Sequence, residues 1–214
     1  MSRKVTRSDG KISKESILEA TLILILDQGL RGIKYKTVSE VAGVTPSSIA
    51  YYFNSIEALI EESFKFYFSK YAEAMIDTRL IGERVLQQYR NQDLTVNGVK
   101  HDLIDSYVES VLDIVAHESP EVSTFLLLDR IFRNETLTNP SLYRILKVQD
   151  QYDIDAITDF LSQLGCENPE IESVQFMSLL WYLSEKLLQE KYSTNMRNRA
   201  AQLLSYFLKK RLIC

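Results

Sequence analysis

The sequence predicts an all-α protein, and three observations favour this fold class. The chain of 214 residues contains only 7 glycines and 4 prolines, fewer than a fold rich in turns needs. No run of alternating β-branched residues suggests a strand. Proline is favoured at the first position of a helix, and each proline here follows a residue that can cap one. The four pairs are Thr45-Pro46, Ser119-Pro120, Asn139-Pro140 and Asn168-Pro169. We therefore expect about nine helices.

The first expected helix begins after Ser13, which can serve as its N-cap, and ends near Gly29. Its apolar residues recur at helical spacing and form a core-facing stripe. Leu22, Ile23 and Leu26 widen this stripe beyond one face. We therefore expect this helix to be buried on a second side, against the C-terminal part of the chain.

The most informative stretch, residues 37–53, predicts two short helices joined by a glycine turn. Val38, Val41 and Ala42 are spaced so that they share one apolar face of the first helix. Gly43 then ends this helix, because glycine adopts the left-handed backbone conformation without a steric penalty.

The second short helix of this stretch has a capped start and an apolar inner face. Thr45 is the expected N-cap and Pro46 the first helical residue. Ile49 and Phe53, four residues apart, point back towards the preceding helix. Such a pair of helices is either an ordinary helical hairpin or a helix-turn-helix that presents its second helix to a DNA major groove. The outward-facing residues, all able to form hydrogen bonds, are Ser47, Ser48, Tyr51 and Tyr52.

The charge distribution favours the DNA-binding alternative. Residues 1–54 contain 8 Lys and Arg against 5 Asp and Glu, a net charge of +3, whereas residues 55–214 contain 17 against 24, a net charge of −7. Contact with phosphates needs such a local basic region. Part of this charge lies in residues 1–12, which form either a disordered terminus or a basic arm. As an arm, Arg3, Lys4 and Arg7 would reach the DNA backbone or the minor groove.

Residues 13–60 resemble the N-terminal DNA-binding domain of the tetracycline-repressor (TetR) family of bacterial regulators. The matching residues, in the family's order and spacing, are Ile17, Leu18, Ala20, Gly29, Thr37, Val38, Ala42, Gly43, Val44, Thr45, Ile49, Phe53, Ser55, Glu57 and Leu59. The chain departs from the family pattern at three positions. Ala50 stands where Tyr is usual, Tyr52 where His is common, and Ile56 where a phosphate-contacting Lys is frequent. These departures alter the expected phosphate contacts and leave the hydrophobic frame intact.

The resemblance implies a division of labour between two parts of the chain. Residues 1–54 would bind operator DNA, and residues 55–214 would dimerise and bind an effector. We expect base recognition through the second short helix, and backbone contacts, which carry no sequence information, at the start of the first. The expected DNA-binding residues are Lys34, Lys36, Thr37, Thr45, Pro46, Ser47, Ser48, Tyr51 and Tyr52.

The helices after residue 53 follow from capping residues and loop signals. A long helix extends from a cap at Asn54 or Ser55 to about Arg79, with Glu57 near the positive end of its dipole. Gly82 and the polar segment 90–98 mark loops. Further helices are expected near 98–117, 120–134, 140–164, 169–190 and 194–212.

The long helix is rich in aromatic residues, and in the family it joins the two domains and lines the effector cavity. Most of these rings can equally be core residues. Few of the residues expected to point inwards are charged, so we expect a mostly apolar cavity for an aromatic or amphipathic small molecule. The candidate effector-binding residues are Phe64, Tyr67, Phe68, Tyr71, Tyr107, Phe125, Leu128, Tyr152 and Trp181.

The last two helices are apolar on more than one side, which predicts a dimer interface. Paired with their symmetry copies, they would form a four-helix bundle that buries the surplus apolar surface. The residues assigned to this interface are Phe176, Leu179, Leu183, Leu204, Phe207 and Leu208.

Catalytic, cofactor and metal sites are not expected. Cys166 and Cys214 form neither a disulfide framework nor a metal-binding spacing, which favours a reducing cytoplasm. His101 and His117 lack the neighbours that mark a metal site, and no phosphate-binding glycine loop or nucleophile elbow is present. The absence of about 18 consecutive apolar residues predicts no membrane span.

Together these features predict a cytoplasmic homodimeric regulator that represses transcription and is released from its operator by a small, mostly apolar effector. The alternative is an architectural or partner-regulated DNA-binding protein of the same fold that has no small-molecule effector. A helical enzyme is a further alternative, disfavoured by the lack of catalytic motifs.

Overall fold

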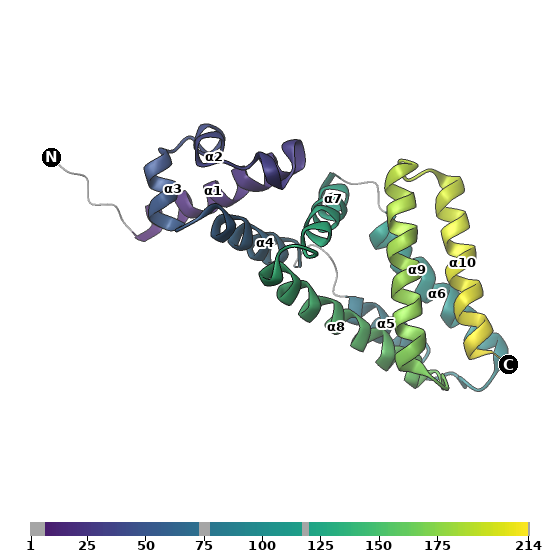
Figure 1. Cartoon of the computed structure of the whole chain (residues 1–214). Coiled ribbons are helices and arrows are strands. Elements are labelled where there is room, and N and C mark those ends of the chain that lie inside the picture. Colours follow the sequence, from purple (N-terminus) through teal and green to yellow (C-terminus); the bar gives the residue numbers. More distant parts are fainter. Residues whose placement is uncertain (1–6, 73–77, 117–119, 214) are drawn as a thin grey trace. The chain divides into compact units, whose positions relative to one another are not determined.

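The computed structural model describes residues 7–72, 78–116 and 120–213, and this part of the chain is helical with no strand (Figure 1). The all-α fold class is confirmed. Ten α-helices and one 3₁₀ helix, Leu30–Gly32, are described. The α-helices are α1 Arg7–Gln28, α2 Tyr35–Ala42, α3 Pro46–Tyr52, α4 Ile56–Ala72, α5 Thr78–Gln88, α6 Asn97–Val115, α7 Pro120–Glu135, α8 Pro140–Gln163, α9 Pro169–Gln189 and α10 Thr194–Leu212.

The prolines mark helix starts as predicted, because each of the four is the first residue of its helix. Two of the capping residues before them also form the expected hydrogen bonds. The Thr45 side chain accepts from the Ser48 N–H, and Asn139 Oδ1 accepts from the Ser141 and Leu142 N–H groups at 3.1 and 3.3 Å. These bonds satisfy N–H groups that have no partner within the helix.

Two expected boundaries were wrong. The first helix starts at Arg7, so Ser13 lies inside it and is not an N-cap. Gly82 lies within α5, a helix that the sequence analysis did not predict and that raises the number from about nine to ten. The expected burial of a second side of α1 was wrong at Ile23, which is 58% exposed, although Leu22 is buried.

The chain divides into two compact units. The first comprises Met1–Tyr71 and Leu127–Arg144, and the second comprises Ala72–Leu126 and Ile145–Cys214. This grouping differs from the functional division at residues 54 and 55, because α4 and the segment 127–144 belong with the N-terminal helices. The functional division itself stays a prediction.

The first unit has a core of aliphatic residues from its N-terminal helices and of aromatic rings from α4. Ile17 and Ile25 of α1 and Ile49 of α3 are fully buried. Phe64 of α4 meets Phe132 of α7 edge-on, with ring centroids 4.4 Å apart. Long-range apolar contacts of this kind fix α4 against residues some 70 positions later, as expected for a compact core.

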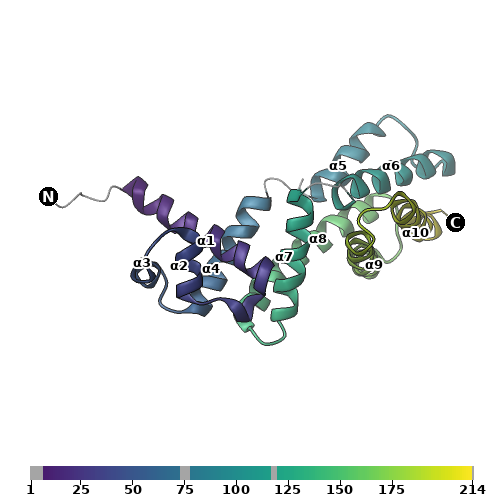
Figure 2. The same cartoon turned by 90° about the horizontal axis from the view of Figure 1, so that it is seen from above.

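The second unit is built from α5, α6, α9, α10, the first part of α7 and most of α8. In both views α9 and α10 run side by side, and α6 lies next to α10 (Figures 1 and 2). At its core the Tyr107 ring of α6 stacks on Phe160 of α8, with centroids 4.0 Å apart. Burial raises the pKa of the Tyr107 hydroxyl, because its charged form would lose the hydration of water.

Polar contacts join α6 to the helices around it. The Lys100 ammonium donates to the carbonyl oxygens of Leu164 and Leu212, at 3.0 and 3.1 Å, and so meets the C-terminal ends of α8 and α10. A cation at the end of a helix is favoured by the helix dipole. Arg197 of α10 bonds Glu109 and Asp113 of α6 at 2.9 and 2.8 Å. These contacts fix the register of α10 on α6.

Within the described part of the chain, no helix is long and apolar enough to span a membrane.

The close approach of α5 to α8 at Gly82 leads to the first prediction. A Cβ atom at Gly82 would lie 3.2 and 3.3 Å from Phe160 Cδ2 and Cβ, whereas one at Gly98 in α6 would meet nothing within 4 Å. Gly98→Ala should therefore leave the free energy of unfolding unchanged or raise it by up to about 1 kcal/mol. The free energy of unfolding of Gly82→Ala should be about 1–2 kcal/mol lower than that of Gly98→Ala, because Phe160 must move.

Urea denaturation followed by circular dichroism measures this difference, and Gly98→Ala serves as the matched control. Equal stabilities for the two variants would show that the α5–α8 contact is looser than described.

Candidate nucleic-acid interface

The turn between α2 and α3 depends on the backbone of Gly43. This residue has φ 66° and ψ 28°, in the left-handed region where a side chain would be strained. Its N–H and that of Val44 both donate to the Ser39 carbonyl, the second at 3.1 Å. The turn therefore supplies hydrogen-bond donors to a carbonyl group at the end of α2, and α3 begins only three residues after Gly43.

The start of α3 is held by a cluster of hydroxyl groups. Thr45 Oγ1 accepts from the Ser48 N–H at 3.2 Å, and it lies 2.7 Å from Ser47 Oγ and 2.9 Å from Ser48 Oγ. Thr45 is thus the N-cap of α3 as well as a candidate DNA contact. These hydroxyl groups bond to one another at the exposed end of the helix, where they can exchange partners with a ligand.

The outer face of α3 is polar, and of the four residues predicted to face outwards Ser47 and Tyr51 are exposed. Tyr51 is 81% exposed, and its ring meets the Tyr52 ring edge-on at 5.1 Å. Pro46 and Ser47 are also exposed, whereas Ser48 and Tyr52 are half-buried. Ile49 and Phe53 are buried on the opposite side, at 0 and 2% exposure. The helix therefore presents hydroxyl groups and one aromatic face to its surroundings.

The start of α2 carries two exposed cations. Lys34 and Lys36 are exposed, and the Thr37 hydroxyl accepts from the Lys34 N–H at 3.2 Å and donates to the Lys34 carbonyl at 2.9 Å. The predicted apolar stripe of α2 needs one correction. Val41 is 48% exposed, and the residue buried beside Val38 is Ser39. The Ser39 hydroxyl is accommodated there because it donates to the Lys36 carbonyl at 2.7 Å.

Two residues near this site had no signal in the sequence. The Tyr35 hydroxyl, at the start of α2, donates to the Phe53 carbonyl at the end of α3, at 2.9 Å. The Lys14 ammonium, on α1, lies 5.6 Å from the centre of the Phe53 ring. These residues are separated from Phe53 by 18 and 39 positions, so the periodicity within one helix could not predict their contacts with it.

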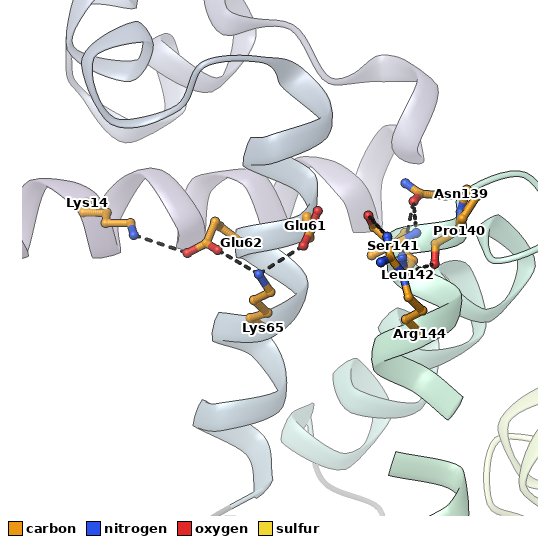
Figure 3. A network of polar contacts seen from close by, with 9 residues as sticks. All are labelled: Lys14, Glu61, Glu62, Lys65, Asn139, Pro140, Ser141, Leu142 and Arg144. Carbon is orange, nitrogen blue, oxygen red and sulfur yellow. Dashed lines mark hydrogen bonds and ion pairs between the residues drawn. The ribbon is translucent and has the colours of Figure 1, made fainter. Parts of the chain in front are cut away.

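Lys14 also belongs to an ion-pair chain between α1 and α4 (Figure 3). Its ammonium lies 3.3 Å from Glu62, and Lys65 lies 3.1 Å from both Glu61 and Glu62. The hydrogen bond from Lys65, and to a smaller extent that from Lys14, lowers the pKa of the Glu62 carboxyl. Glu62 is therefore ionised at neutral pH and attracts both cations.

The candidate effector-binding residues fall in both compact units. In the first unit Phe64, Tyr67 and Leu128 are buried, and Phe68 is half-buried. The Phe64 and Phe68 rings are 4.7 Å apart, and Phe132, which the sequence analysis missed, completes their cluster. The side chain of Tyr71 lies outside the described residues.

In the second unit the candidate effector-binding residues differ in exposure. Tyr107 is buried in the core, Phe125 and Trp181 are half-buried, and Tyr152 is 39% exposed. A buried side chain can reach a ligand only by lining an internal cavity or by moving. The partly exposed rings of this unit are therefore the stronger candidates for ligand contact.

The assignment of dimer-interface residues needs correction. Four of the six, Phe176, Leu183, Leu204 and Leu208, are at most 1% exposed and pack into the core of the second unit. Leu179 and Phe207 pack at the edge of the same core. The apolar residues that α9 and α10 do expose are Ile171, Val174, Tyr182, Leu203 and Tyr206.

No cluster of three or more His, Cys, Asp or Glu side chains that could bind a metal occurs among the described residues. His117 and Cys214, like the basic residues Arg3 and Lys4, lie outside that part of the chain.

Comparison with known sequences and structures shows which proteins this chain is similar to. Residues 17–63, which span most of α1 to the first half of α4, match the sequence model of the bacterial regulatory proteins of the tetR family. No curated protein sequence matches the chain.

Similar folds occur among solved structures of bacterial regulators. A transcriptional regulator from Rhodococcus sp. Rha1 is 14% identical with a TM-score of 0.66, and the match covers 92% of this chain and 96% of that one. NalD of Pseudomonas aeruginosa, the secondary repressor of the MexAB-OprM multidrug efflux pump, is also 14% identical with a TM-score of 0.64, and covers 96% and 99%. A regulator from Saccharomonospora viridis in complex with choline is 15% identical with a TM-score of 0.62, and covers 92% and 95%. At these identities the likeness shows a shared fold.

Proposed function

We propose that this chain, whose N-terminal domain belongs to the tetR family of bacterial regulatory proteins, is a homodimeric repressor that a small molecule releases from its operator. The observation that carries the proposal is the helix-turn-helix at residues 35–53, with a buried apolar side and an exposed polar recognition helix. A protein of this kind acts by binding DNA, and we assign it no enzymatic activity.

The proposed DNA contacts divide into two roles. Ser47 and Tyr51 lie on the exposed face of α3 and would contact base edges in the major groove. Lys34 and Lys36 would contact phosphates, which position the protein without reading sequence. Thr37, Thr45, Pro46, Ser48 and Tyr52 are further candidate contacts around these four residues.

Substitutions in the two groups should therefore have different effects on DNA binding. Ser47→Ala and Tyr51→Ala should each reduce discrimination between the operator and a scrambled duplex, by about 1–3 kcal/mol where a base contact is lost. Lys36→Ala should weaken binding to both duplexes alike and flatten the salt dependence by about one unit of slope. The operator is first selected from fragments of the host genome, and affinities are then measured by fluorescence anisotropy at several salt concentrations.

Lys147→Ala, at an exposed lysine of α8 in the second unit, is the matched control for loss of a positive charge. If all three interface substitutions reduced affinity for both duplexes to the same extent and with the same salt dependence, the division into base and phosphate contacts would be wrong.

The exposed apolar residues of α9 and α10 support a dimer. Ile171, Val174 and Tyr182 recur at helical spacing on α9, and Leu203 and Tyr206 do so on α10. Most of the other apolar residues of these two helices pack in or against the core of the second unit, so that core does not need these five. Pairing of two such helices with their symmetry copies would remove them from water.

Tyr182→Glu combined with Tyr206→Glu should therefore give a folded monomer. Both tyrosines are exposed, at 54 and 64%, so the substitution adds charge to the surface without entering the core. Sedimentation velocity at micromolar concentration should show a dimer for the wild type and a monomer for the variant, which should also lose affinity for a two-half-site operator.

Val148→Glu, at a residue of α8 that is 72% exposed, is the control and should remain dimeric. Leu204→Glu should instead unfold the second unit, because Leu204 is fully buried. A wild-type monomer, or a dimeric double variant, would contradict the proposed interface.

The proposed effector is a small, mostly apolar molecule that contacts the aromatic residues of the C-terminal part. Phe125, Tyr152 and Trp181 are partly exposed rings of the second unit. Aromatic faces bind apolar groups and also quaternary ammonium ions. Choline, the ligand of the Saccharomonospora viridis regulator, is of the latter kind. The compounds to test therefore include both neutral aromatic molecules and quaternary amines.

A ligand of this class should change both the fluorescence of Trp181 and the affinity for the operator. Trp181 is the single tryptophan of the chain, so its emission reports on one site. Coupling between effector and operator is typically about 1–3 kcal/mol and must be reciprocal, so saturating ligand should weaken operator binding and operator should weaken ligand binding equally. Phosphorylated sugars serve as negative controls.

If no compound alters operator affinity or Trp181 emission, the alternative of an architectural or partner-regulated DNA-binding protein should replace this part of the proposal.

A further inference from the structure

Contacts to Phe53 hold the C-terminal end of the recognition helix. Its carbonyl accepts the hydrogen bond from Tyr35 of α2, its ring lies beneath the Lys14 ammonium of α1, and its side chain is 2% exposed. Its N–H donates to the Ile49 carbonyl and completes the last turn of α3. Phe53 is thus the point at which α1, α2 and α3 meet.

The two ends of the helix-turn-helix are closed in different ways. At one end the Gly43 turn joins α2 covalently to α3. At the other end the two helices have no covalent connection, and the hydrogen bond from Tyr35 to the Phe53 carbonyl, at 2.9 Å, spans the gap. The last carbonyl groups of a helix have no partner within it, so a donor from outside both satisfies one of them and fixes its position.

Lys14 links Phe53 to Glu62 of α4. Its ammonium is close to the Phe53 ring, at 5.6 Å, and to the Glu62 carboxylate, at 3.3 Å. Glu62 in turn pairs with Lys65 on the next turn of α4 (Figure 3). A displacement of α4 that moved Glu62 would therefore alter the position of the cation above Phe53.

We propose that Tyr35 and Lys14 are positioning residues for DNA recognition, which set the orientation of α3 by holding Phe53 from α2 and from α1. Tyr51 and Tyr52 directly precede Phe53, so a displacement of Phe53 would move both tyrosines. The role does not require either residue to touch DNA. The inference rests on the proposed DNA-binding function for its consequence, but the contact with Phe53 can be measured without DNA.

Tyr35→Phe tests the hydrogen bond, because it removes the hydroxyl group and keeps the ring. The matched control is Tyr89→Phe in the second unit, where the hydroxyl lies 3.0 Å from Ser106 Oγ and is similarly half-buried. Both full-length variants are compared with the wild type in three measurements: amide hydrogen exchange at Tyr52 and Phe53, affinity for the selected operator, and affinity for a scrambled duplex.

Tyr35→Phe should accelerate amide exchange at the end of α3 and weaken operator binding about threefold to tenfold per half-site, as expected for the loss of one half-buried hydrogen bond. Its affinity for the scrambled duplex and its salt dependence should match the wild type, because no phosphate contact is removed. Tyr89→Phe should leave all three measurements at wild-type values.

Three outcomes would overturn the role of Tyr35: unchanged exchange at Tyr52 and Phe53, unchanged operator affinity, or equal losses in Tyr35→Phe and Tyr89→Phe. Failure of the proposed function is a different result. In that case the wild type selects no DNA sequence, while amide exchange still shows whether Tyr35 holds the end of α3.

The role of Lys14 must be separated from a direct phosphate contact, since its side chain is 41% exposed. Lys14→Met removes the charge and keeps an apolar stem, Lys14→Arg restores a cation, and Glu62→Gln removes its partner on α4. For a positioning residue, Lys14→Met and Glu62→Gln should both lower operator affinity at unchanged salt dependence, and Lys14→Arg should recover it.

If Lys14 contacted a phosphate directly, Glu62→Gln would have the opposite effect. Removal of that negative charge would then strengthen binding to both duplexes, and Lys14→Met would flatten the salt dependence by about one unit of slope. This result, or unchanged affinity in both variants, would overturn the role of Lys14.

Discussion

The recognition helix has seven residues, and a helix of this length depends on its surroundings for stability. Isolated helices shorter than about 12–15 residues are marginal in water. In this protein α3 receives its stability from Thr45 at its start, from buried Ile49 in its middle and from Phe53 at its end. Thr45 acts within the first turn of α3 itself, whereas α1 and α2 pack against α3 and contact Phe53. Exposed residues such as Tyr51 are not needed for packing and remain available for recognition.

In the second unit the apolar residues of the last two helices must be removed from water, and these helices have apolar residues on more than one side. The core takes one set of them, as at Phe176 and Leu204, and ion pairs such as Arg197 with Asp113 fix α10 against α6. An aligned pair of helices then presents a second, exposed apolar set. This exposed apolar set is the reason for proposing that the protein acts as a dimer.

Features that depend on neighbours along the chain could be predicted closely. The prolines placed the starts of α7, α8 and α9 at the residues observed, because the preference of proline for the first position of a helix acts within a single turn. Gly82 predicted a loop, since glycine usually marks a break, but it lies within α5. Its place inside α5 has a distant cause, because the absence of a side chain leaves room for Phe160 of α8. The contact of Tyr35 with Phe53 could not be predicted either, because the two residues are 18 positions apart in the sequence.

By itself, the sequence determined the helical class, the helix-turn-helix and its exposed polar face, because each follows from spacing within one or two helices. The tertiary structure decided which apolar residues are core and which are surface. Leu183 and Tyr182 are adjacent on α9, and only packing in the core of the second unit makes the first fully buried and leaves the second 54% exposed. Apolar spacing shows that a helix has more than one apolar side. Which side is covered depends on residues far along the chain, and their positions are known only once the chain has folded.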